Sequence, residues 1–363
     1  MESFDRSQWP QNRVHELALI RSWQAADDRN RRLKAGGDFI LDEPETIPAV
    51  WGVDDRVLWP EGEGVMTVGH QGVGKTTIGQ QLVLHRLGIR EGALFGLPVK
   101  RDDRPILYLA MDRPRQAARS FRRMISESDR QPLNEQLAVW GGPLPVDPTK
   151  DKDQFVDFAE QVCPNVGTIV VDSVKDLAPG ISDDKVGSAL NQSWQEAIAR
   201  DVQLMLLHHE RKAANGNKRI HSLDDVYGST WLTSGLGSVM VLEGESGDPT
   251  VELRHLKQPA EPIGPLTLRH EHGVGRTVLF DGQPDLKQYL IAAGTNGVTA
   301  EEAAMAIIGR ATDNDKKTIK RHLEKLIKQQ MAYKHAGRRT SNGAEPDRWY
   351  ASPQANWSHR EDL

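Results

Sequence analysis

The sequence is short of several features that mark particular classes of protein. It has one cysteine, Cys163, in 363 residues. A single cysteine excludes an intrachain disulfide and a zinc cluster built on cysteines, and it suits a reducing compartment. Apolar runs of membrane-spanning length are missing, and the N-terminus lacks the charged-then-apolar layout of a signal peptide. We therefore expect a cytoplasmic protein that does not enter the membrane.

The bulk composition also lacks an excess of positive charge. The formal net charge is -5, so any surface that attracts nucleic acid must be local. Internal repeats and low-complexity runs are missing as well. The length is sufficient for one large domain and a smaller one.

The most informative segment that is present reads GHQGVGKTT, at residues 69–77. It contains a complete G-x-x-x-x-G-K-[ST] phosphate loop, in which glycines let backbone N–H groups surround phosphates. The lysine of this pattern adds charge at the β- and γ-phosphates, and the threonine hydroxyl binds Mg²⁺. The apolar run before the loop predicts a strand, and the spacing after it predicts a helix whose N-terminus faces the phosphates. The predicted nucleotide site consists of Gly69, His70, Gln71, Gly72, Val73, Gly74, Lys75, Thr76 and Thr77.

Strands and helices alternate after this loop, and short strands follow them. The expected strands are 65–69, 104–112, 136–142, 167–173, 203–209, 238–243, 251–257, 265–271 and 276–281. The pattern predicts a mainly parallel α/β sheet with antiparallel strands at one edge.

Segments on either side of this core have a different character. A loose arm at 1–11 precedes a charged helix at 12–35, which Gly36 and Gly37 are expected to end. This helix either packs locally or docks on a neighbouring subunit. After the core, three helical segments and a two-stranded hairpin predict a winged helix-turn-helix. The expected division is 1–49 for the arm and helix, 50–283 for the core, 284–353 for the winged helix and 354–363 for a tail.

Polar residues lie at or near the ends of three of the expected core strands. Asp172 ends the run TIVVD, as a Walker B carboxylate that supports Mg²⁺ would, or else it caps a turn. Asp112 can polarise the water that attacks the γ-phosphate, or it can cap the helix that begins with Pro114. His209 is placed to sense the γ-phosphate, or it is structural. The histidines of the HEH segment at 270–272 are interpreted as surface residues.

These segments together resemble a known family. GHQGVGKTT, YLAMD, VVDS, LLHHERK, and YGSTWL followed by SVMVLE are similar to RecA-like hexameric replicative helicases, AAA-like P-loop NTPases of the plasmid and phage type. The resemblance covers about 50–282 and implies a RecA-like core that uses ATP and Mg²⁺. It implies that Lys75 and Thr76 hold phosphate and metal. Asp112 stands where the family usually has a catalytic glutamate, and the side chain here is one methylene shorter.

The resemblance also implies that a basic residue from one subunit completes the site of the next. Lys257 is the first candidate for this finger and Arg254 the second, although both could be ordinary charges on an edge strand. In such rings single-stranded DNA passes through a central channel. The loop at 211–227 is the best candidate for contacting it. Its basic residues are Arg211, Lys212, Lys218 and Arg219. The alternative is an ordinary solvated loop.

A second basic surface is expected in the winged helix. Its third helix and hairpin carry Lys316, Lys317, Lys320, Arg321, Arg338 and Arg339. These charges favour contact with DNA phosphates, whereas a protein partner is the competing interpretation.

The sequence thus predicts an ATP-dependent, ring-forming DNA helicase or translocase that acts in DNA replication. The expected partners are single-stranded or forked DNA, further copies in a hexamer, and replication proteins. The alternative is an ATP-switched DNA-binding loader or regulator without unwinding activity. A filament-forming recombinase is disfavoured, because the basic C-terminal segment and the HH-x-x-K pattern are more typical of a helicase.

Overall fold

The computed structural model describes residues 32–210, 222–244, 246–248, 250–271, 273–280, 286–308, 311–337, 339–340 and 343–352. Within these ranges, no helix is both long enough and apolar enough to cross a membrane.

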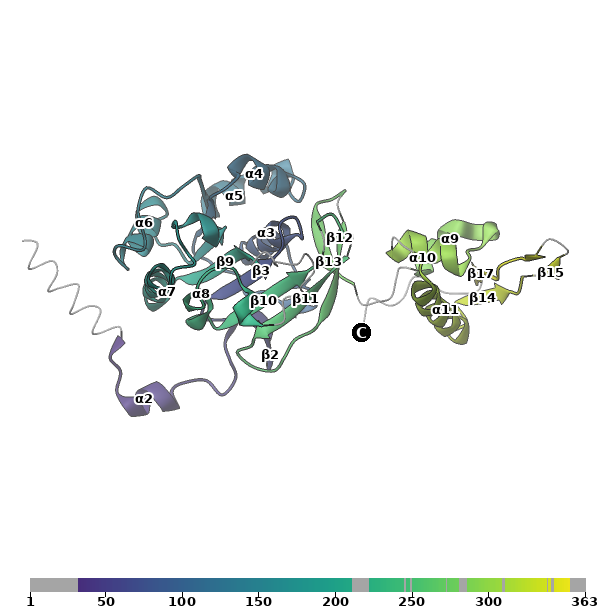
Figure 1. Cartoon of the computed structure of the whole chain (residues 1–363), viewed down its shortest axis with the longest axis horizontal. Coiled ribbons are helices and arrows are strands. Elements are labelled where there is room, and N and C mark those ends of the chain that lie inside the picture. The colour runs from purple at the N-terminus through teal and green to yellow at the C-terminus, as the bar shows by residue number, and fades with distance from the viewer. Residues whose placement is uncertain are drawn as a thin grey trace, which may run out of the picture.

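The centre of the molecule is a nine-stranded sheet with the order β13-β12-β11-β10-β3-β9-β8-β6-β7 (Figure 1). Strands β10, β3, β9, β8, β6 and β7 run parallel. Their bounds are β10 (Ser238–Glu243), β3 (Val65–Gly69), β9 (Gln203–His209), β8 (Thr168–Asp172), β6 (Ile106–Ala110) and β7 (Leu137–Gly141). Because these strands are parallel, their carboxyl ends lie along one edge of the sheet, where the predicted site residues follow them.

The remaining strands of the sheet form an antiparallel meander. It consists of β11 (Thr250–Lys257), β12 (Leu266–Glu271) and β13 (Arg276–Leu279). The mixed sheet expected from the sequence is therefore confirmed, and it fits a RecA-like P-loop α/β core.

Each face of the sheet is covered by a separate hydrophobic core, because alternate residues of a strand point to opposite faces. One core joins the strands to α3 (Lys75–Arg86) and α4 (Pro114–Arg122). The other core joins them to helices that follow later in the chain. These are α6 (Gln154–Val162), α7 (Asp184–Ala199) and α8 (Trp231–Ser234). The short helix α5 (Arg130–Gln136) precedes β7.

A hairpin that the sequence reading missed extends the first core. Strands β1 (Ala49–Val53) and β2 (Arg56–Pro60) pair in a segment where no strand was expected. Trp51 and Trp59 are fully buried, and the Trp51 indole donates to the Leu94 carbonyl at 3.0 Å. The alternating apolar residues around an Asp-Asp turn were the available signal. A second small hairpin, β4 (Ala93–Leu94) with β5 (Leu97–Pro98), lies beside the first.

The N-terminal helix expectation needs correction where the structure describes it. Most of 12–35 lies outside the described residues, but Leu33 to Ala35 are not helical, and α2 (Gly36–Leu41) begins at the glycines that were expected to end a helix. The expectation relied on the poor helix propensity of glycine. That penalty is about 1 kcal/mol, which is too small to decide the boundary alone.

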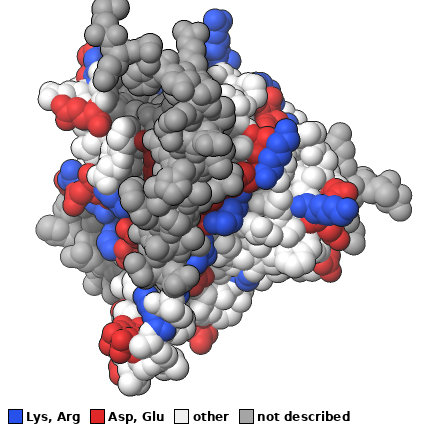
Figure 2. All heavy atoms as spheres, turned by 90° about the vertical axis from the view of Figure 1, so that its left-hand side faces the viewer, with Lys and Arg blue, Asp and Glu red and all other residues white. Residues whose placement is uncertain are grey.

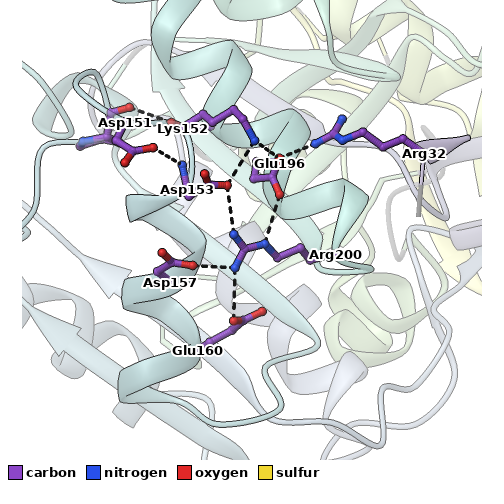
Figure 3. A network of polar contacts seen from close by, with 10 residues as sticks. Arg32, Asp151, Lys152, Asp153, Asp157, Glu160, Glu196 and Arg200 are labelled. Carbon is purple, nitrogen blue, oxygen red and sulfur yellow. Dashed lines mark hydrogen bonds and ion pairs between the residues drawn. The ribbon is translucent and has the colours of Figure 1, made fainter. Parts of the chain in front are cut away.

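A buried carboxylate anchors the start of the described chain. Glu196 of α7 is only 1% exposed and contacts Arg32, Lys152 and Arg200 (Figure 3). Arg200 in turn forms ion pairs with three acidic residues of the α6 region, which are Asp153, Asp157 and Glu160. Burial alone would raise the pKa of Glu196, but hydrogen bonds from Lys152 and Arg200 outweigh it and lower that pKa to about 2. The network therefore holds an ionised carboxylate between α6, α7 and the N-terminal segment.

The C-terminal segment has its own core. The three expected helices are present as α9 (Leu286–Ala293), α10 (Ala300–Ile308) and α11 (Asp313–Lys328). The expected two-stranded hairpin is present as β14 (Ala332–His335) and β17 (Arg348–Ala351). Two further short strands that were not expected, β15 (Arg339–Thr340) and β16 (Gly343–Ala344), pair with each other. Their buried residues form a cluster without members from the large sheet, and Figure 1 draws these elements to the right of that sheet. The boundary at residue 283 stays a prediction.

Candidate nucleotide-binding site

The phosphate loop joins the end of β3 to the start of α3. Gly69 is the last residue of β3 and Lys75 the first of α3. Gly72 and Gly74 have φ angles of +86° and +97°, which residues with a Cβ adopt at a cost. The predicted strand–loop–helix arrangement is therefore present, and the N-terminus of α3 opens onto the loop.

Lys75 folds back over the loop that it follows. Its ammonium donates to the carbonyl oxygens of Gly69 and His70, both at 2.8 Å. Burial lowers the pKa of Lys75 to about 8, against the opposing attraction of the Asp172 carboxylate. A phosphate bound in the loop would supply the negative charge that this buried ammonium favours.

The two predicted metal-binding residues are brought together. Asp172 ends β8, and the Thr76 hydroxyl donates to its Oδ2 atom at 2.9 Å, although 96 residues separate them. A hydroxyl and a carboxylate are hard oxygen ligands of the kind that Mg²⁺ prefers, usually with phosphate oxygens and water completing the shell. Within the described residues no group of three or more His, Cys, Asp or Glu side chains could hold a metal.

Tyr108 is a site residue that the sequence reading missed. Its hydroxyl donates to the same Asp172 oxygen at 2.7 Å from the interior of β6. Burial raises the pKa of Asp172, whereas hydrogen bonds from Tyr108 and Thr76 lower it in part. Burial also raises the pKa of Tyr108 well above its usual value, so it remains a donor. Tyr108 lies within the expected strand 104–112, and its hydroxyl was the only signal in the sequence.

Asp112 lies just beyond the end of β6. Its carboxylate contacts the Arg113 guanidinium at 3.2 Å and the Lys175 ammonium at 3.8 Å, and it is 44% exposed. The residue at the N-cap of α4 is Arg113, and no side chain caps that helix end. The capping alternative for Asp112 is therefore not what the structure shows. Its catalytic role stays a prediction.

His209 ends β9 directly beside the phosphate loop. Its register partner on β3 is Gly69. Burial is the main cause that lowers the pKa of His209 to about 3, and the positive charges of Lys75 and Lys175 add to it. The ring is therefore neutral near pH 7. His208 instead points into the core, where its Nε2 atom donates to the Tyr227 carbonyl at 2.6 Å, and burial lowers its pKa to about 4.

The sequence analysis did not identify two further charged residues near the carboxyl ends of the parallel strands. Lys175 lies in the turn after β8 and contacts Asp112. Glu210 follows β9, and burial raises its pKa while the charges of His70 and Lys75 oppose that shift. Their positions in the sequence could have identified them, because each follows an expected strand by one to three residues.

The two finger candidates make contacts within their own chain. Lys257, the last residue of β11, donates to the carbonyls of Thr233 at 3.2 Å and Ser234 at 2.8 Å at the end of α8. Arg254 pairs with Glu243 of β10 at 2.7 Å. Neither contact tests a role at another subunit, so both assignments stay predictions.

The structure describes only some of the residues that were predicted to bind DNA. Arg211, Lys212, Lys218, Arg219 and Arg338 lie outside the described residues, and the side chain of Arg339 is not described. Lys317, Lys320 and Arg321 are exposed on α11. Lys316 lies near Asp313 at 3.5 Å and Glu301 at 3.8 Å. On the face of the molecule shown in Figure 2, basic and acidic side chains are interspersed, which matches the near-balanced charge of the sequence.

Comparisons with known proteins add to this geometry. A family model described as an AAA domain matches residues 29–215. A search of curated proteins finds no match. Among solved structures, the chain is similar to a KaiC-like protein, PH0186, from the hyperthermophilic archaeon Pyrococcus horikoshii OT3. The two are 16% identical with a TM-score of 0.40, over 61% of this chain and 90% of that one. Because the family match spans more than half of the 363 residues, the chain belongs to the AAA domain family of P-loop ATPases.

Proposed function

We propose that this ATPase is a ring-forming DNA helicase or translocase that acts in DNA replication in the cytoplasm. The observation that carries the proposal is the contact between Thr76 and Asp172 beside the buried Lys75. It brings together the phosphate, metal and lysine functions of a hydrolytic phosphate loop.

Each residue of the site has its own role in the hydrolysis of ATP. Lys75 and the loop amides bind the β- and γ-phosphates, while Thr76 and Asp172 would hold Mg²⁺, which neutralises phosphate charge when bound. Asp112 accepts a proton from the attacking water. The water oxygen bonds to the γ-phosphorus while the bond between the γ-phosphorus and the bridging oxygen breaks, and ADP leaves. His209, which is neutral, responds to the presence of the γ-phosphate.

Coupling to DNA rests on elements around this site. Lys257 would leave its contacts with α8 and reach the nucleotide of the next subunit in a hexamer. Residues of the 211–227 loop would hold single-stranded DNA in the ring. These roles are supported by sequence pattern and by the position of β11 next to β10 in the sheet.

The C-terminal segment would be a winged helix that binds duplex or forked DNA. Three helices and an antiparallel strand pair are the parts of such a module, and α11 would act as its recognition helix. The exposed charges of Lys317, Lys320 and Arg321 favour contact with phosphates.

The test is the ATPase rate with and without single-stranded DNA, for the wild type and for Lys75→Ala, with mass determined on the same samples. Hydrolysis by a hexamer that DNA stimulates and Lys75→Ala abolishes is the expected result. Hydrolysis that is indifferent to DNA, by a strictly monomeric protein, would overturn the proposal.

A second function is an ATP-switched loader or regulator that binds DNA and replication proteins without unwinding. The position of Asp112 favours it, because its short carboxylate is held by two cations and is nearly half exposed. A strand-displacement assay separates the two functions. Unwinding of a forked duplex supports the helicase, whereas nucleotide-dependent DNA binding without displacement supports the regulator.

A further inference from the structure

A histidine of the meander contacts the phosphate loop from outside. His270 of β12 was interpreted as a surface residue, but its Nε2 atom lies 3.1 Å from the Val73 carbonyl oxygen. A carbonyl only accepts hydrogen bonds, so Nε2 is the donor. The Nδ1 atom lies 2.8 Å from the Thr277 hydroxyl, from which it accepts when the ring is neutral. The ring thus bridges β13 and the phosphate loop.

This bridge is fixed at its other end to the helix that follows the loop. The Gln81 side chain of α3 accepts from the Thr277 amide at 2.7 Å and donates to the Thr277 carbonyl at 2.9 Å. Gln81 is 8% exposed and Thr277 is 1% exposed. The paired bonds tie β13 to α3, so the position of His270 is tied to the helix that carries Lys75.

The contact also explains why residue 74 is a glycine. A Cβ atom at Gly74 would lie 2.3 Å from the Cε1 atom of His270, closer than such contacts allow. Gly74 also has a φ of +97°. Because glycine rotates freely, the peptide unit between Val73 and Gly74 can turn over unless something holds it.

The planar peptide gives that contact a direction. In a trans peptide the C=O and N–H groups point to opposite sides. A bond that holds the Val73 carbonyl toward His270 therefore aims the Gly74 N–H away from His270. In a phosphate loop the backbone N–H groups are the ones that bind the phosphates.

We propose that His270 is a positioning residue that holds the Val73–Gly74 peptide in the orientation that binds nucleotide phosphates. This inference rests on the proposed nucleotide site. It assigns part of the affinity for nucleoside di- and triphosphates to a residue of the meander, about 200 positions after the loop in the sequence.

A matched pair of substitutions tests the proposal. Glutamine can place an amide N–H where the Nε2 atom of histidine lies, whereas the shorter asparagine reaches only the Nδ1 position. We therefore expect His270→Asn to raise the Kd for both ATP and ADP by about threefold to tenfold, the size of one hydrogen bond. His270→Gln should remain within about twofold of the wild type.

Amide hydrogen exchange without nucleotide gives a readout that does not depend on ATP. Exchange in a peptide covering 70–77 should be faster in His270→Asn than in the wild type and His270→Gln. Equal exchange and equal affinities in all three proteins would overturn the proposal. So would equal losses in both variants accompanied by a lower Tm, since that result indicates packing alone. A wild type that binds neither nucleotide would instead overturn the proposed site, and the exchange rates would still test His270.

Discussion

The hydroxyl of Thr76 donates a 2.9 Å hydrogen bond to the Asp172 carboxylate, so the last residue of the phosphate-loop pattern contacts the end of β8, which lies two strands away from β3 in the sheet. Strand β9 lies between β3 and β8. The Thr76 and Asp172 side chains meet across the end of β9. His209 is the last residue of that strand, so it lies at the same end of the sheet.

Replacement of Asp172 should separate nucleotide binding from hydrolysis. Asp172→Asn keeps the shape of the side chain but removes the charge that would support Mg²⁺, so we expect kcat to fall by about a hundredfold or more. The Kd for ADP measured without Mg²⁺ should change little. Tyr108→Phe is the matched control, since it retains the carboxylate and removes one hydrogen bond. A similar loss of hydrolysis in both variants would contradict a metal role for Asp172.

The buried ammonium of Lys75 predicts uptake of a proton when ATP binds in alkaline solution. Its pKa is lowered to about 8 in the nucleotide-free protein, and phosphate beside it must raise that pKa. Affinity for ATP should therefore weaken as pH rises above 8, by up to about tenfold per unit, because the neutral amine attracts phosphate poorly. Calorimetry at pH 8 in two buffers of different ionisation enthalpy measures the proton. Identical heats in both buffers would exclude the linkage.

Asp112 gives a test of the catalytic base that does not depend on binding. Asp112→Asn should lower kcat by about a hundredfold to ten-thousandfold, the usual contribution of a general base, with little change in the Kd for ATP. Asp112→Glu restores the methylene that this chain lacks relative to the family it resembles, and it should retain or raise kcat. If Asp112→Asn hydrolyses ATP at the wild-type rate, the base lies elsewhere.

The exposed cations of α11 predict binding to nucleic acid that depends on salt. Replacement of Lys317, Lys320 and Arg321 by alanine should weaken DNA binding uniformly across sequences. It should also reduce the slope of log K against log salt by about three, one for each phosphate contact. Filter binding or anisotropy at several salt concentrations measures the slope. An unchanged slope, with affinity for a protein partner lost, would support the partner-docking interpretation.

The buried carboxylate of Glu196 predicts loss of stability in acid. Its pKa of about 2 lies below the ordinary value of 4.5. The ionised form therefore stabilises the fold above pH 4.5, and this contribution is lost as pH falls from 4.5 toward 2. The shift corresponds to about 3 kcal/mol. Glu196→Gln should lower the free energy of unfolding at pH 7 by about that amount and flatten its acid dependence.

The control for Glu196 is Glu160→Gln, which removes a half-exposed partner of the same Arg200. Exposed ion pairs contribute about 1 kcal/mol or less. Urea unfolding at pH 7 and pH 4 measures both variants. Equal effects of the two substitutions would show that burial of Glu196 does not matter.

The sequence by itself determined the phosphate loop, the run of parallel strands, the antiparallel meander and the polar residues at the strand ends. These features depend on local patterns: glycines where the backbone needs positive φ, apolar runs where a strand is buried on both faces, and carboxylates directly after them. The same local patterns indicate a P-loop ATPase.

Only the tertiary structure decided which of these residues meet. That Tyr108 bonds to Asp172, that His270 bonds to the Val73 carbonyl and that Glu196 is buried among cations all depend on strand order and register. The hairpin that buries Trp51 and Trp59 was also identified only from the tertiary structure. Such contacts join residues far apart in the chain, and a side chain that is polar at one end and apolar at the other does not reveal from its letter alone which end will find a partner.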